Sequence, residues 1–90
     1  MQAMGGVMSL TGEPDGEPLK VGVSIADLMA GMYATVSILA ALRHRDKTKQ
    51  GHHLDISMLD AHVAWLANQG MNYLATGSNP DRLGNQHPNI

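Results

Sequence analysis

The 90-residue sequence contains no cysteine and no phenylalanine, and its only aromatic residues are Tyr33, Trp65 and Tyr73. The absence of cysteine excludes disulfides, thiolate metal ligands and thiol nucleophiles. Only 16% of the residues are charged and the net charge is −2, whereas about a quarter of an average globular protein is charged. Such a chain offers no basic surface to nucleic acid or anionic lipid, so no nucleic-acid partner is expected.

Long apolar runs and targeting signals are also absent. The sequence has no uninterrupted run of about 18 apolar residues, so it predicts no membrane-spanning helix and no membrane partner. The first residues lack the basic and apolar regions of a secretory signal, and we therefore expect a cytoplasmic protein. What the sequence does contain is 43% hydrophobic residues, with seven Met among them, a composition that suits close contacts between helices.

The spacing of apolar residues predicts a mainly α-helical segment with one short strand. Residues 1–23 are rich in Gly and Pro and predict an ordered loop, with room for one short helical turn near its start. Residues 24–45 and 59–76 have apolar side chains at helical spacing. Residues 53–58 alternate polar and apolar side chains, as a half-buried strand does. Residues 77–90 predict an extended tail or linker.

A single strand cannot form a sheet, because its backbone N–H and C=O groups need a neighbouring strand. The two predicted helices also carry wide apolar stripes, which leave more apolar surface than 90 residues can cover. We therefore expect this chain to be one segment of a larger domain or to self-associate, most simply as a two-fold homodimer.

Asp27 is the main candidate for chemistry. It would lie in the first turn of the helix predicted over residues 24–45, where unsatisfied backbone N–H groups favour a negative charge. A carboxylate held there can act as a nucleophile or a base. Spacing alone favours a simpler interpretation, in which Ser24 and Asp27 form a Ser-x-x-Asp variant of the capping box and Asp27 only stabilises the helix start.

No other group of residues has the spacing of a known site. The adjacent His52 and His53 would point to opposite sides of a strand and cannot share a metal ion, so no metal site is expected. The glycines before residue 24 match neither of the common phosphate-binding glycine patterns. Asp60 is expected in the first turn of the second helix, where the helix dipole accounts for it.

Several motifs occur together in an order that resembles a known enzyme family. Residues 2–12 read Gln-Ala-x-Gly-Gly-x-Met-Ser-x-Thr-Gly, and Val-Gly-Val-Ser then leads to Asp27 in an Asp-x-x-x-Gly context. Ile-Leu-Ala-Ala-Leu at residues 38–42 and Leu-Asp-Ile-Ser-Met-Leu-Asp-Ala at residues 54–61 follow. The chain closely resembles, over essentially its whole length, the family III CoA-transferases, which include formyl-CoA and carnitine CoA-transferases and the related α-methylacyl-CoA racemases.

The resemblance implies an α/β parent fold, a homodimer, and Asp27 as the catalytic carboxylate. It implies an acyl-CoA thioester as the substrate and no permanently bound cofactor. Asp27 would attack the thioester carbonyl, and the aspartyl anhydride would become an aspartyl-CoA thioester whose CoA passes to a carboxylic acid acceptor. The resemblance assigns no CoA-contacting residue within this chain.

The sequence is also compatible with two functions other than CoA transfer. In a family racemase the residue that matches Asp27 is a base opposite a histidine upstream of this segment. The second alternative is a truncated, non-catalytic dimerisation module, which would keep the helices but have no CoA site. Whichever function is correct, we expect the isolated 90-residue chain to be inactive. One motif departs from the family, whose turn Thr-Gly-x-Gly-Gln is Thr48-Lys49-Gln50-Gly51-His52 here.

Overall fold

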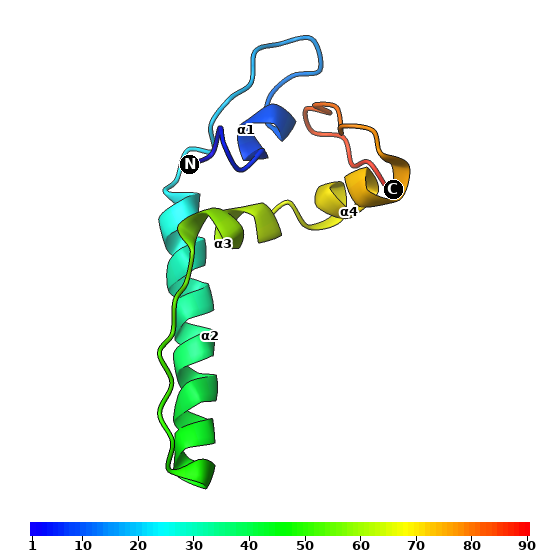
Figure 1. Cartoon of the computed structure of the whole chain (residues 1–90). Coiled ribbons are helices and arrows are strands. Elements are labelled where there is room, and N and C mark those ends of the chain that lie inside the picture. The colour runs from blue at the N-terminus through cyan, green and yellow to red at the C-terminus, as the bar shows by residue number, and fades with distance from the viewer.

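The computed structural model describes all 90 residues and contains four helices and no strand (Figure 1). The helices are α1 at Val7–Leu10, α2 at Ile25–Thr48, α3 at Met58–Ala64 and α4 at Ala67–Thr76. Helix α2 forms the long axis of the molecule, α3 crosses its N-terminal end, and α1 and α4 lie beyond this crossing (Figure 1). The segment is mainly α-helical, as predicted, although it is not the predicted helix–strand–helix.

The chain does not close around a large core of its own. Its radius of gyration is 16.6 Å and its dimensions are 55 × 27 × 21 Å, whereas a compact domain of this length has a radius of gyration of roughly 12 Å. The few buried residues come from the N-terminal segment, the first turn of α2, and α3. They are Gly5, Val7, Ile25, Ala26, Ala61 and His62.

Helix α2 confirms the helix predicted over residues 24–45, but it continues to Thr48. Four of its apolar residues, Leu28, Met32, Val36 and Leu39, are more than half exposed, so the predicted apolar stripe stays uncovered. The helix is also long and apolar enough to cross a membrane, which corrects the expectation that no segment could do so. A single helix of this kind is weak support for a membrane protein, because the core helix of a larger protein has the same length and composition.

Residues 53–58 do not form the predicted strand. Residues 50–57 run back along α2 without regular secondary structure (Figure 1), and Met58 already belongs to α3. The backbone N–H groups of residues 51–56 donate no hydrogen bond, because no second strand lies beside them. Alternating side chains predict an extended backbone, but a strand exists only when a neighbouring strand completes the ladder.

The helix predicted over residues 59–76 is broken into α3 and α4. The N–H groups of Trp65 and Leu66 bond three residues back, to His62 and Val63, and Ala67 has a φ of 49°. This break lets α3 stay on α2 while α4 faces α1 across a cavity lined by residues of both helices. The predicted end of the second helix is confirmed, since Gly77 caps α4 with a φ of 72°.

The predicted tail, residues 77–90, has no helix or strand but is folded back rather than extended. Arg82 Nη2 donates to Gly16 O at 2.6 Å, and the Gly84 N–H donates to Gly12 O at 3.1 Å. Asn89 Oδ1 accepts a hydrogen bond from Asn68 Nδ2 at 2.8 Å. These bonds fasten the tail to the N-terminal loop and to α4.

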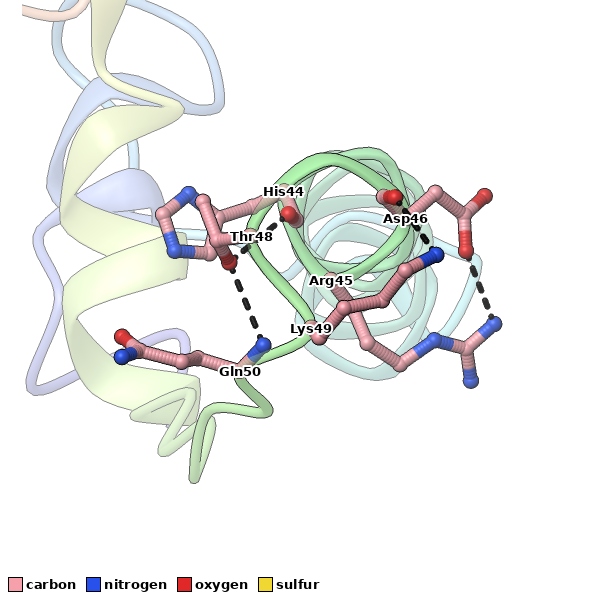
Figure 2. Close-up of polar contacts among 6 residues, drawn as sticks. All are labelled: His44, Arg45, Asp46, Thr48, Lys49 and Gln50. Atoms are coloured by element: carbon pink, nitrogen blue, oxygen red, sulfur yellow. Dashed lines mark hydrogen bonds and ion pairs between the residues drawn. The ribbon is translucent and has the colours of Figure 1, made fainter.

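Lys49 closes the C-terminal end of α2 in the left-handed conformation, with a φ of 62°. Its N–H donates to Arg45 O at 2.7 Å. Its Nζ donates to Asp46 O at 3.0 Å (Figure 2). Beside it, Thr48 Oγ1 donates to His44 O at 3.0 Å and accepts from the Gln50 N–H at 3.2 Å (Figure 2). A residue with a Cβ is strained in this conformation by about 1–2 kcal/mol. Gly is the residue expected at this position from the resemblance described above.

Replacing Lys49 with Gly is therefore expected to raise the free energy of unfolding by about 1 kcal/mol. Urea unfolding of the 90-residue chain, followed by circular dichroism, measures the change. The matched control is Lys47→Gly inside the last turn of α2, which should lower the free energy of unfolding by about 1 kcal/mol. A loss of stability in Lys49→Gly would contradict the strain argument.

Candidate functional site

Asp27 lies in the first turn of α2 and its side chain is exposed. Its carboxylate makes no hydrogen bond and no ion pair, since the only ion pair of the chain joins Arg45 and Asp46. The position predicted for Asp27 is therefore confirmed. The carboxylate is free to meet a molecule from solution.

The surface around Asp27 is hollowed into a shallow cleft of about 420 Å³, named here the Asp27 cleft. The N-terminal segment forms one side of it, and the loop that leads into α2 forms the other. Lys20 is the only lysine, arginine or histidine in its lining. The lining residues are Met1, Gln2, Ala3, Met8, Lys20, Val21, Gly22, Val23, Ser24, Ile25, Ala26 and Asp27.

The capping role that spacing alone favours for Asp27 is not observed. Ser24 occupies the N-cap position of α2, but its side chain makes no capping hydrogen bond. The same Ser-x-x-Asp spacing recurs at α3, where Ser57 Oγ accepts a hydrogen bond from the Asp60 N–H at 3.2 Å. One copy of the pattern thus caps its helix, whereas the other leaves both of its side chains free.

Two backbone donors are also free at the head of α2. The N–H groups of Ile25 and Leu28 bond to Val23 O at 2.8 Å and to Ser24 O at 3.1 Å, whereas those of Ala26 and Asp27 have no acceptor. Free N–H groups at a helix N-terminus favour a negative charge beside them. The site therefore combines a free carboxylate with two donors that can bind an oxyanion.

The other residues considered from the sequence lie away from this cleft. His44 and His52 are in contact at the far end of α2, with ring centroids 4.5 Å apart, and the helical rise separates His44 from Asp27 by about 25 Å. No group of three or more His, Asp or Glu is gathered in the chain. Asp60 lies in the first turn of α3, as predicted.

Sequence reasoning missed one residue that shapes the site, Gln2, and one that is buried outside the Asp27 cleft, His62. Gln2 bonds to the loop that enters α2, and its place in the motif of residues 2–12 was the only available signal. His62 is completely buried, neither of its ring nitrogens has a hydrogen-bond partner, and its ring packs against Gly5. No feature of the sequence distinguishes this histidine from the exposed ones.

Comparisons with known proteins agree on one family. The family model of CoA-transferase family III matches residues 1–90. The chain is 53% identical over 90 residues to the succinate–glutarate CoA-transferase of Agrobacterium fabrum, covering 100% of this chain and 22% of that protein. It is 45% identical over 89 residues to the acetyl-CoA:oxalate CoA-transferase of Acetobacter aceti, covering 98% of this chain and 23% of that protein.

A solved structure shares the fold of the segment. The crystal structure of a CAIB/BAIF family protein from Brucella suis superposes with a TM-score of 0.92 at 53% sequence identity, covering 99% of this chain and 24% of that one. The chain thus spans about a fifth to a quarter of the length of the relatives it matches. Its exposed helix faces are accordingly those of a segment that relatives carry within a much longer polypeptide.

Proposed function

Because this chain belongs to CoA-transferase family III, we propose that it supplies the catalytic carboxylate for moving CoA from an acyl-CoA thioester to a carboxylic acid. The observation that carries the proposal is the Asp27 carboxylate, which lies exposed in a cleft and has no partner within the protein. A carboxylate that is free of structural contacts can act as a nucleophile.

The proposed reaction proceeds through covalent intermediates on Asp27. A carboxylate oxygen of Asp27 attacks the thioester carbonyl, the C–S bond breaks, and CoA leaves as a thiolate from an aspartyl–acyl anhydride. The thiolate then attacks the aspartyl carbonyl, which releases the donor acid as a carboxylate and leaves an aspartyl-CoA thioester. The acceptor carboxylate repeats these two steps in reverse order, so that acceptor acyl-CoA is formed and Asp27 is regenerated without net proton or electron transfer.

The head of α2 suits this chemistry. Each step passes through a tetrahedral oxyanion, and preorganised N–H donors lower the energy of such a species. The free N–H groups of Ala26 and Asp27 are the donors that this segment offers. These two N–H groups would stabilise the oxyanion in the steps that attack the carbonyl of Asp27, or the carbonyl of a group bound beside Asp27.

We propose a short dicarboxylic acid as one of the acids that exchange CoA. The two curated relatives described above are named for succinate, glutarate and oxalate, which are all dicarboxylic acids. A cation favours binding of the second carboxylate of such an acid, and Lys20 is the only cationic side chain in the lining of the Asp27 cleft.

We also propose that further polypeptide covers α2 in the whole enzyme. Its side chains Leu28, Met32, Val36 and Leu39 are more than half exposed, and exposed apolar faces of this kind mark contacts with other protein. The homodimer and the cytoplasmic location expected from the sequence stay predictions.

A chimera tests the proposed function. In it, residues 1–90 replace the matching segment of the Agrobacterium succinate–glutarate CoA-transferase, to which they are 53% identical. We expect the chimera to convert succinyl-CoA and labelled glutarate to labelled glutaryl-CoA. Exchange of the α-proton of an acyl-CoA in D2O without CoA transfer would indicate a racemase, and a folded chimera with neither activity would indicate a non-catalytic module.

A further inference from the structure

The side chain of Gln2 is bonded to the loop that enters α2. Its Oε1 accepts a hydrogen bond from the Val21 N–H at 2.6 Å, and its Nε2 donates to Val21 O at 3.2 Å and to Val23 O at 3.4 Å. One amide group thus pairs with both the donor and the acceptor of Val21, much as a neighbouring strand would. Gln2 itself is half-buried.

Little else holds this loop in place. Between Leu19, whose N–H bonds to Thr11 O, and Ile25, whose N–H bonds to Val23 O, Gln2 provides the only hydrogen bonds from outside the loop and α2. Packing restrains the loop weakly, because Val23 is 58% exposed and a Cβ added at Gly22 would meet no atom within 4 Å. The position of the loop therefore depends on the side chain of Gln2.

We infer that Gln2 is a positioning residue for the Asp27 carboxylate, an inference that rests on the proposed function. The loop held by Gln2 ends at Ser24, and the first turn of α2 with Asp27 follows directly. The loop sets the direction from which the chain enters α2, together with Ile25 and Ala26, whose buried side chains hold the first turn of the helix. A displaced loop therefore shifts the Asp27 carboxylate relative to the other residues that line the cleft.

The motif of residues 2–12 gains a physical role from this contact. Gln2 also lines the Asp27 cleft, on the side formed by the N-terminal segment. Its side chain therefore reaches from this side to the loop that forms the opposite side. A misplacement of about 1 Å of a reacting group can lower a rate by about 100-fold. Gln2 therefore acts on the rate of the chemical step by positioning Asp27.

The test compares Gln2→Ala with Gln2→Glu in the chimera. Gln2→Ala should lower kcat for CoA transfer by about 10- to 100-fold with KM within about two-fold of the parent value. Gln2→Glu keeps the acceptor for the Val21 N–H but loses the donor, and it should recover part of the lost kcat. The control is Gln86→Ala, because Gln86 is exposed and its side chain makes no hydrogen bond; it should leave kcat unchanged.

Hydrogen exchange measured by mass spectrometry separates this inference from the proposed function. In Gln2→Ala, a peptide covering residues 17–24 should lose the protection of one amide, that of Val21, while Tm changes no more than in Gln86→Ala. Unchanged exchange at this peptide, an unchanged kcat, or a fall in kcat that only follows a lowered Tm would each overturn the inference. If the parent chimera itself transfers no CoA, the proposed function fails, and the exchange result alone decides whether Gln2 holds the loop.

Discussion

Asp27→Asn is expected to lower CoA transfer by the chimera by at least about 10⁴-fold while leaving its fold intact. An amide has nearly the shape of a carboxylate, but its oxygen is a poor nucleophile and it cannot form the anhydride. The fold should be unaffected because the Asp27 side chain makes no hydrogen bond and no ion pair in the protein. Conversion of labelled glutarate to labelled glutaryl-CoA in the presence of succinyl-CoA, together with Tm, measures both effects.

Asp60→Asn is the matched control for this variant. Asp60 also lies in the first turn of a helix, α3, so both variants remove one negative charge from a helix N-terminus. The loss of the favourable charge–dipole interaction should cost about 0.3–1 kcal/mol in each, and only Asp27→Asn should lose transfer. If Asp27→Asn retained near-normal transfer, Asp27 would not be the nucleophile.

Gly5→Ala is expected to lower the free energy of unfolding by about 2–3 kcal/mol, a large effect for a single methyl group. A Cβ at Gly5 would overlap Cδ2 of His62 and lie 3.1 Å from its Cγ and Nε2. The ring cannot move aside easily, because His62 is completely buried. Urea unfolding of the 90-residue chain, followed by circular dichroism, measures the loss.

Two further variants separate overlap with the ring from other effects of the methyl group. Gly31→Ala adds the same methyl group within α2, where no atom lies within 4 Å, and it should raise the free energy of unfolding by about 0.5–1 kcal/mol. In a His62→Ala background, Gly5→Ala should cost less than it does alone, because the ring is gone. Equal costs in both backgrounds would show that the Gly5–His62 contact does not limit this position.

The sequence by itself determined the features that depend on a few neighbouring residues. Apolar spacing predicted α2, and Gly77 predicted the end of α4, because helix formation and its termination are decided within one or two turns. The place of Asp27 in the first turn of α2 was predicted on the same grounds. The ordered motifs around Asp27 indicated CoA-transferase family III, which the comparisons confirm.

Only the tertiary structure decided the features that depend on residues far apart in the chain. Residues 53–58 have the side-chain pattern of a strand but no neighbouring strand, and the helix predicted over residues 59–76 breaks at Ala67, where α3 stays on α2 and α4 faces α1. The physical reason is that a hydrogen bond or a packed surface needs a partner in space, and the local pattern records only one of the two partners.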